Sequence, residues 1–81
     1  MELKDTIDLM NSEDYTDRLR AEYYQTKIRY DKLHSMIIKY EAGKLDFEPE
    51  CSIELLKEQA RYMGNYLYIL EVRSEVENIK L

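Results

Sequence analysis

The placement of glycine and proline constrains this chain more than any other feature of its sequence. Its two glycines are Gly43 and Gly64, and its single proline is Pro49. From Ser12 the chain therefore runs for about thirty residues without a helix breaker, which is enough for roughly 45 Å of α-helix. Gly43 follows this run and is typical of the residue that ends a helix. A helical protein is the expected result.

Apolar residues recur at spacings of three and four on both sides of residues 43–51, and this spacing places them on one face of a helix. We predict an all-α fold in which two antiparallel helices form a hairpin after a short N-terminal helical segment. The helices are expected at about 12–42 and 52–78, the loop at 43–51, the N-terminal segment within residues 1–11, and a single domain over residues 1–81.

Capping residues and chain register follow from the same pattern. Ser12 is the expected N-cap of the first long helix, and Cys51 or Ser52 that of the second. Leu45 and Phe47 are expected to fold back over the end of the hairpin. If the chain folds about residue 47, residues whose numbers sum to about 94 lie opposite each other.

This register predicts both the core and the ion pairs of the hairpin. The core is expected to contain Leu33, Ile37, Leu56, Met63 and Leu67. Two basic residues near the start of the first helix are expected opposite two acids near the end of the second, Arg18 and Arg20 facing Glu71 and Glu75.

Chain length predicts self-association. A chain of 81 residues buries only about 60–65% of the surface that its unfolded form exposes, so its stability as a monomer is marginal. One cysteine cannot form an internal disulfide. Both predicted helices have apolar faces wider than one partner helix covers. We therefore expect a homo-oligomer.

Composition excludes several classes of protein. The formal net charge is −5, so binding to DNA or RNA polymers is not expected. No apolar run approaches the roughly 20 residues that span a bilayer, so no membrane association is expected. No signal-peptide pattern follows Met1, and a single cysteine suits a reducing compartment. The predicted location is the cytoplasm of a host cell.

Catalytic, metal and cofactor sites are not predicted. His34 is the only histidine and Cys51 the only cysteine, and the register places His34 near Ala60 instead. Cys–His chemistry needs hydrogen-bond contact, and structural zinc needs four Cys or His ligands. Glycine-rich loops that bind phosphate are absent. We expect no enzymatic activity, no metal and no cofactor.

Tyrosine and positive charge point to two alternative uses of the same surface. The chain has eight tyrosines, no tryptophan and one phenylalanine, and residues 18–44 hold seven basic residues against three acids. Tyrosines beside basic groups can stack a base and bind a phosphate. They can equally form a subunit interface, with the charges paired or solvated. The candidate ligand-binding residues are Tyr23, Tyr24, Lys27, Arg29 and Lys32, with Tyr62 and Tyr66 on the second helix.

Five segments carry a likeness to a known family, residues 21–25, 39–47, 51–59, 63–67 and 70–73. Together they resemble a family of small proteins of gut bacteriophages and prophages that are related to a crAss-like phage protein. The likeness covers most of residues 15–78, although Ser52 stands where the family pattern has proline. The second helix, with the pattern Leu-x-x-Gln-x-x-x-Met-x-x-Tyr-Leu over residues 56–67, is also distantly similar to small helical phage sponges for cyclic nucleotide immune signals.

The resemblance implies a phage counter-defence protein, but it assigns no binding residue. The leading hypothesis is a protein that binds and sequesters a nucleotide second messenger of a host immune system, with a cyclic nucleotide or an ADP-ribose-type compound as ligand. One alternative is an antagonist or adaptor that binds a host protein. Another is a structural helical phage protein.

Overall fold

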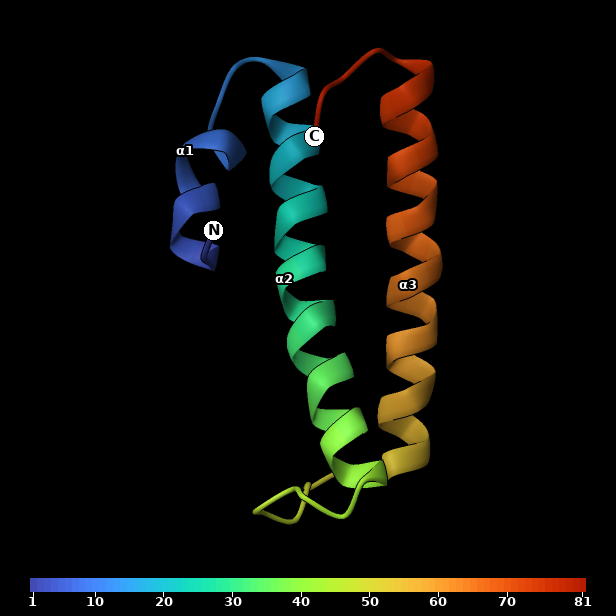
Figure 1. The fold of residues 1–81 in the computed structure, drawn as a ribbon. Helices are drawn as coiled ribbons and strands as arrows, with labels where there is room; N and C mark the ends of the chain where they lie inside the picture. Colours follow the sequence, from blue (N-terminus) through green and yellow to red (C-terminus); the bar gives the residue numbers. More distant parts are fainter.

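The computed structural model describes all 81 residues and contains only helices. Figure 1 shows α2 and α3 side by side, with the N-terminal segment beside the first half of α2. The predicted all-α class is confirmed, and each long helix is a few residues shorter than expected. The elements in chain order are the 3₁₀ helix η1 (Leu3–Thr6), α1 (Ile7–Met10), α2 (Tyr15–Glu41) and α3 (Ile53–Val76).

The prediction that Ser12 caps the first long helix is wrong, because Asp14 is its N-cap. The Asp14 carboxylate accepts a hydrogen bond of 2.9 Å from the backbone N–H of Thr16. A carboxylate interacts more favourably than a hydroxyl with the positive end of a helix dipole. Ser12 instead accepts from the backbone N–H of Asp14 and donates to the Asp17 carboxylate, which stabilises the turn before the helix.

Gly43 ends α2, as its position in the sequence predicts. Its φ angle is +71°, in the left-handed region that glycine adopts without strain. The N–H of Gly43 donates to the carbonyl of Tyr40, and the N–H of Lys44 donates to that of Lys39. These two bonds form a Schellman motif, which turns the chain back along the helix it has just left.

The two ends of α3 are also closed by local hydrogen bonds. Ser52 is the N-cap and accepts from the N–H of Leu55, whereas Cys51 is exposed in the preceding loop. Asn78 has a φ of +58° just after the C-terminus of α3, where the N–H of Ile79 donates to Ser74. The chain then folds back, and Ile79 is buried.

Contacts between α2 and α3 follow the expected register. The Tyr23 hydroxyl donates to the Glu71 carboxylate at 2.7 Å. A Cβ atom added to Gly64 would lie 3.4 Å from the Tyr30 ring, so Tyr30 of α2 packs against α3 beside Gly64. The numbers of the residues in each pair sum to 94.

The predicted ion pairs between Arg18 or Arg20 and the acids of α3 are wrong, since closer acceptors bind both guanidinium groups. Arg18 donates to the carbonyl of Ser12. Arg20 donates to the carbonyl of Lys80 and pairs with Asp17. The Glu71 carboxylate accepts a hydrogen bond from the Tyr23 hydroxyl and not from either arginine.

The buried residues gather at the end of the hairpin where the chain termini lie. Of the predicted core, Ile37 and Leu67 are buried, whereas Leu33, Leu56 and Met63 are only half-buried, because two helices alone leave one side of each uncovered. Ile37 is the only buried residue near the loop. The others are Thr6, Leu19, Ala21, Tyr23, Leu67, Leu70, Ser74 and Ile79.

The molecule is elongated, with extents of 43 × 25 × 17 Å. Its radius of gyration of 14.9 Å exceeds the value of about 12 Å expected for a compact domain of this length.

Gln25 joins the N-terminal segment to α2 by donating to the Thr6 hydroxyl at 3.0 Å. No helix is both long and apolar enough to cross a membrane.

Candidate functional site

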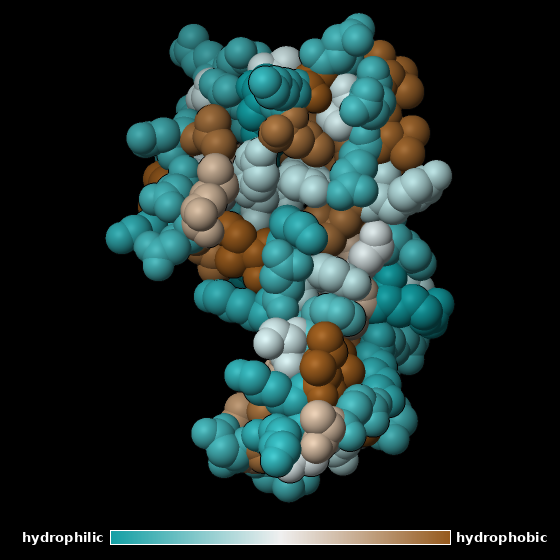
Figure 2. All heavy atoms as spheres, viewed as in Figure 1, coloured by the Kyte–Doolittle hydropathy of each residue, from teal (hydrophilic) through white to brown (hydrophobic).

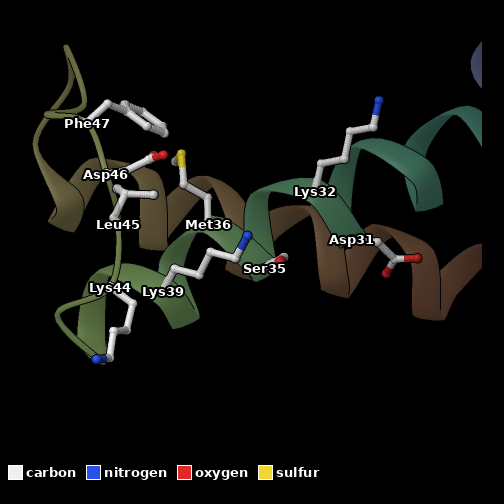
Figure 3. Close-up of a pocket in the computed structure, with 9 residues that line it drawn as sticks. All are labelled: Asp31, Lys32, Ser35, Met36, Lys39, Lys44, Leu45, Asp46 and Phe47. Carbon is white, nitrogen blue, oxygen red and sulfur yellow. The ribbon is translucent and has the colours of Figure 1, made fainter.

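A pocket of about 570 Å³ lies at the loop end of the hairpin, between the last turns of α2 and the loop that follows. Figure 2 shows the outline of the molecule hollowed between the N-terminal segment and this loop. Figure 3 shows the residues that line the pocket. They are Asp31, Lys32, Ser35, Met36 and Lys39 from α2, and Lys44, Leu45, Asp46 and Phe47 from the loop.

The pocket exists because the chain reverses at Gly43. The Schellman motif directs residues 44–47 back along α2, so Leu45 and Phe47 lie beside the helix face that Met36 occupies. Their expected return over the end of the hairpin is thus observed. Leu45 is half-buried, while the Phe47 side chain remains 55% exposed. An aromatic ring in this position is available to a ligand.

The charges around the pocket favour an anion. Lys32, Lys39 and Lys44 line it, and none of them forms an ion pair within the chain. Of the two acids in the lining, Asp31 already pairs with Lys27 at 3.2 Å. Only Asp46 is left to offset the three ammonium groups.

The apolar part of the lining is suited to a flat group. Met36 projects from α2, and Leu45 and Phe47 project from the loop around it. Lys32 and Lys39 extend from the same helix, whereas Lys44 extends away from the apolar residues. A thioether and an aromatic ring both make favourable contacts with aromatic systems. The pocket therefore combines an apolar, partly aromatic surface with unpaired positive charge.

The structure separates the residues that the sequence put forward for ligand binding. Lys32 alone lines the pocket. Tyr23 lies in the core, and its ring contacts the Tyr24 ring edge-on, with 5.3 Å between the ring centres. Burial, with the hydrogen bond to Glu71, raises the pKa of Tyr23 to about 12. Its hydroxyl is thus engaged within the hairpin.

The remaining candidates lie on other surfaces. Lys27 pairs with Asp31, whereas Arg29 is exposed and forms no ion pair. Tyr62 and Tyr66 are exposed on α3, and the Arg61 guanidinium lies 4.5 Å from the Tyr62 ring centre. None of these residues lines the pocket.

Sequence reasoning did not single out most of the pocket, although two signals for it were present. Lys39 follows Lys32 by seven residues, which places both on one side of a helix. The predicted return of Leu45 and Phe47 brings apolar groups to the same end. Combining these two signals would have located the pocket without the structure.

His34 and Cys51 do not come together in the fold. The His34 ring stacks on Tyr30, with 5.6 Å between ring centres and 8° between ring planes. Cys51 is exposed in the loop before α3, and no hydrogen bond joins the two residues. Their contacts are those of a surface histidine and a free thiol.

Residues 13–76 match the protein family described as Sequestin. No curated protein and no solved structure matches the chain. The matched residues include both long helices and the whole pocket. The name of the family denotes sequestration, which is binding without turnover, and it agrees with the likeness to sponges noted in the second helix. This chain is a non-catalytic, sequestering protein and belongs to the Sequestin family.

Proposed function

We propose that this protein is a phage counter-defence sponge that sequesters a nucleotide second messenger of a host immune system. The observation that carries this proposal is the set of three lysines without ion pairs around a pocket that also contains the only phenylalanine of the chain. Membership of the Sequestin family and the likeness to phage sponges support it.

In this proposal the pocket binds the two chemically different parts of a nucleotide. Lys32 and Lys39 bind the phosphates through charged hydrogen bonds. Phe47 stacks on the base, and Met36 and Leu45 contact its edge. A cyclic nucleotide or an ADP-ribose-type compound carries both parts, and a volume of about 570 Å³ lies within the range of small-molecule sites.

Sequestration then acts through concentration alone. Each binding site removes one messenger molecule from solution, and the free messenger falls below the level that activates its effector. The ligand leaves the site chemically unchanged. Protection therefore scales with the number of sites, and it ends when messenger exceeds them.

The proposal is tested by calorimetric titration of the protein with cyclic dinucleotides, cyclic trinucleotides and cyclic ADP-ribose species. One member is expected to bind, and heating the complex should release it intact, as judged by chromatography and mass. Release of a converted product would indicate an enzyme and would contradict the proposal. So would the absence of binding to every class.

The location of the site is tested with the ligand that this panel identifies. Lys32→Ala and Lys39→Ala should each weaken binding about ten- to a hundredfold, the scale of a charged hydrogen bond. Arg29→Ala is the matched control, because it removes a positive charge from α2 outside the pocket and breaks no ion pair. If the control loses affinity and the pocket variants keep it, the site lies on the surface around Arg29 and not in the pocket.

A further inference from the structure

The outer face of α3 carries an apolar seam that nothing in the chain covers. Leu55, Tyr62, Ile69 and Val76 follow one another at intervals of seven residues, and all four are exposed. Val72 lies between the last two and is also exposed. We call these five residues the α3 seam. The opposite face of the same helix packs on α2 through Leu67 and Leu70, so α3 has two apolar faces.

The small core of the molecule makes the exposure of this apolar seam to water a large loss of stabilisation. Only nine of the 81 residues are buried, which is a small core even for a chain of this length. Most large apolar side chains on the outside of α3 are in contact with water in the isolated chain. Covering the seam would bury apolar area without disturbing the contact with α2.

The spacing indicates what covers the seam. Apolar residues at intervals of seven suit a partner helix with the same period, as in a coiled coil. A second copy of α3 has that period by construction. Symmetric association of identical chains is also the commonest form of oligomer.

The charges beside the seam distinguish between the two directions in which a second copy can pair. Arg61 and Glu75 flank the seam, and neither forms an ion pair within the chain. In an antiparallel pair centred on Ile69, residues whose numbers sum to 138 lie opposite each other. Arg61 and Glu75 of the partner subunit lie on the same side of the seam and two residues from that register, within reach of an ion pair, and the reverse pair forms by symmetry. Glu58 follows Leu55 by three residues and therefore lies on the same side of α3. A parallel pair in register would place it against Glu58 of the partner subunit, where like charges repel.

We propose that the protein forms a symmetric dimer through antiparallel pairing of α3 with α3 of a second copy, with Ile69 at the twofold axis. Tyr62 then packs against Val76 of the partner subunit, and the paired stretch runs over residues 62–76. Tyr62 and Tyr66 are part of a subunit contact. The pocket on α2 stays open, and each subunit keeps its own. This proposal stands on the α3 face alone and does not rest on the proposed ligand.

The first test compares two isoleucines of nearly equal exposure. Ile69 is 53% exposed on α3, and Ile38 is 54% exposed on α2. Light scattering of the full chain at micromolar concentration should give twice the monomer mass of 9.8 kDa. Ile69→Lys should give a monomer, while Ile38→Lys should leave the dimer intact. Circular dichroism of each variant shows whether helix content is retained.

The second test uses charge reversal, which leaves the apolar seam intact. It tests the dimer even if Ile69→Lys does not fold. Arg61→Glu alone and Glu75→Arg alone should each weaken dimerisation by placing like charges opposite each other. The double variant, Arg61→Glu with Glu75→Arg, should restore it. Restoration requires the antiparallel register, because the two positions face each other only in that arrangement.

Three results would overturn the proposal. A wild-type chain that is monomeric at micromolar concentration has no such dimer. Dissociation by Ile38→Lys but not by Ile69→Lys would move the interface to α2. A monomer in which α3 binds a purified host protein, with loss of that binding in Ile69→Lys, would assign the seam to a partner of a different kind.

Discussion

The two ends of the hairpin are built differently. Eight of the nine buried residues lie in the half that holds the chain termini, where η1 and α1 pack against α2 and the last residues of the chain pack between α2 and α3. At the loop end only Ile37 is buried, and the loop covers α2 incompletely. The same two helices thus have a packed end and an open one.

The difference shows that the packed end stabilises the fold, whereas the open end has exposed surface that can bind a ligand. At the packed end the core contains Tyr23, Leu67 and Leu70, with Leu81 against them. At the open end, the three lysines that line the pocket, Lys32, Lys39 and Lys44, are exposed and form no ion pair within the chain. A ligand at the open end would meet groups whose loss hardly affects folding.

The largest expected effect is the loss of a core side chain at the packed end. Leu70 is 1% exposed, so Leu70→Ala should lower the free energy of unfolding by about 2–5 kcal/mol, as large-to-small changes in cores do. Leu56→Ala removes the same atoms from a half-buried position near the loop and should cost less. Urea denaturation of both variants measures the difference. Equal losses would mean that the two ends are equally well packed.

The next effect depends on pH and also belongs to the packed end. The pKa of Tyr23 is about 12 in the folded protein against an ordinary value of 10, so the folded state holds this proton more tightly. The resulting stability is fully present below pH 10 and is lost as pH rises towards 12. One pKa unit is worth about 1.4 kcal/mol, so the loss should be on the order of 2 kcal/mol.

Tyr23→Phe provides the control for this titration. It removes the ionising hydroxyl but keeps the ring, and its stability should therefore decline less steeply between pH 10 and 12 than that of the wild type. Lysine deprotonation affects both proteins and cancels in the comparison. Parallel alkaline limbs in the two denaturation profiles would show that Tyr23 ionises as freely as an exposed tyrosine.

The smallest expected effects concern the two glycines, which should respond in opposite directions. Gly43→Ala places a side chain at a φ of +71° and should cost about 1–2 kcal/mol. Gly64→Ala adds a methyl group 3.4 Å from the Tyr30 ring, an ordinary contact, and should gain up to about 1 kcal/mol from helix propensity. Thermal melts of both variants check the signs. A loss at Gly64 would show that Tyr30 has no room to move.

The sequence predicted the class of fold and the approximate helix limits because few breakers interrupt the apolar spacing. The helix end at Gly43 is predicted correctly, and Ser52 is one of the two predicted caps of the second helix, with Cys51, since these signals are local. The predicted Ser12 cap is wrong, because Asp14 lies two residues away and its carboxylate competes for the same N–H groups. The partners of Arg18 and Arg20 depend on where the turn before α2 and the last residues of the chain fold, which the pattern of the helices does not encode.

The pocket was harder to predict than the fold because it depends on a contact between a loop and a helix. Lys32 was identified from charge and spacing, but the value of Phe47 depends on the direction in which the loop leaves Gly43. The Tyr-rich segments predict a ligand site elsewhere on the hairpin, although the Tyr23 ring packs into the core. Composition alone does not distinguish a tyrosine that stabilises the fold from one that meets a ligand.

The exposed thiol of Cys51 has a practical consequence for measuring the pocket. It is the only cysteine of the chain, and it lies in the same loop as Phe47. A single maleimide reaction therefore attaches a fluorescent dye near the open end at one defined position, without any substitution. Since the chain has no tryptophan, the dye is excited well apart from the tyrosine background. The native protein is in this sense ready to serve as an optical sensor of whatever occupies its loop end.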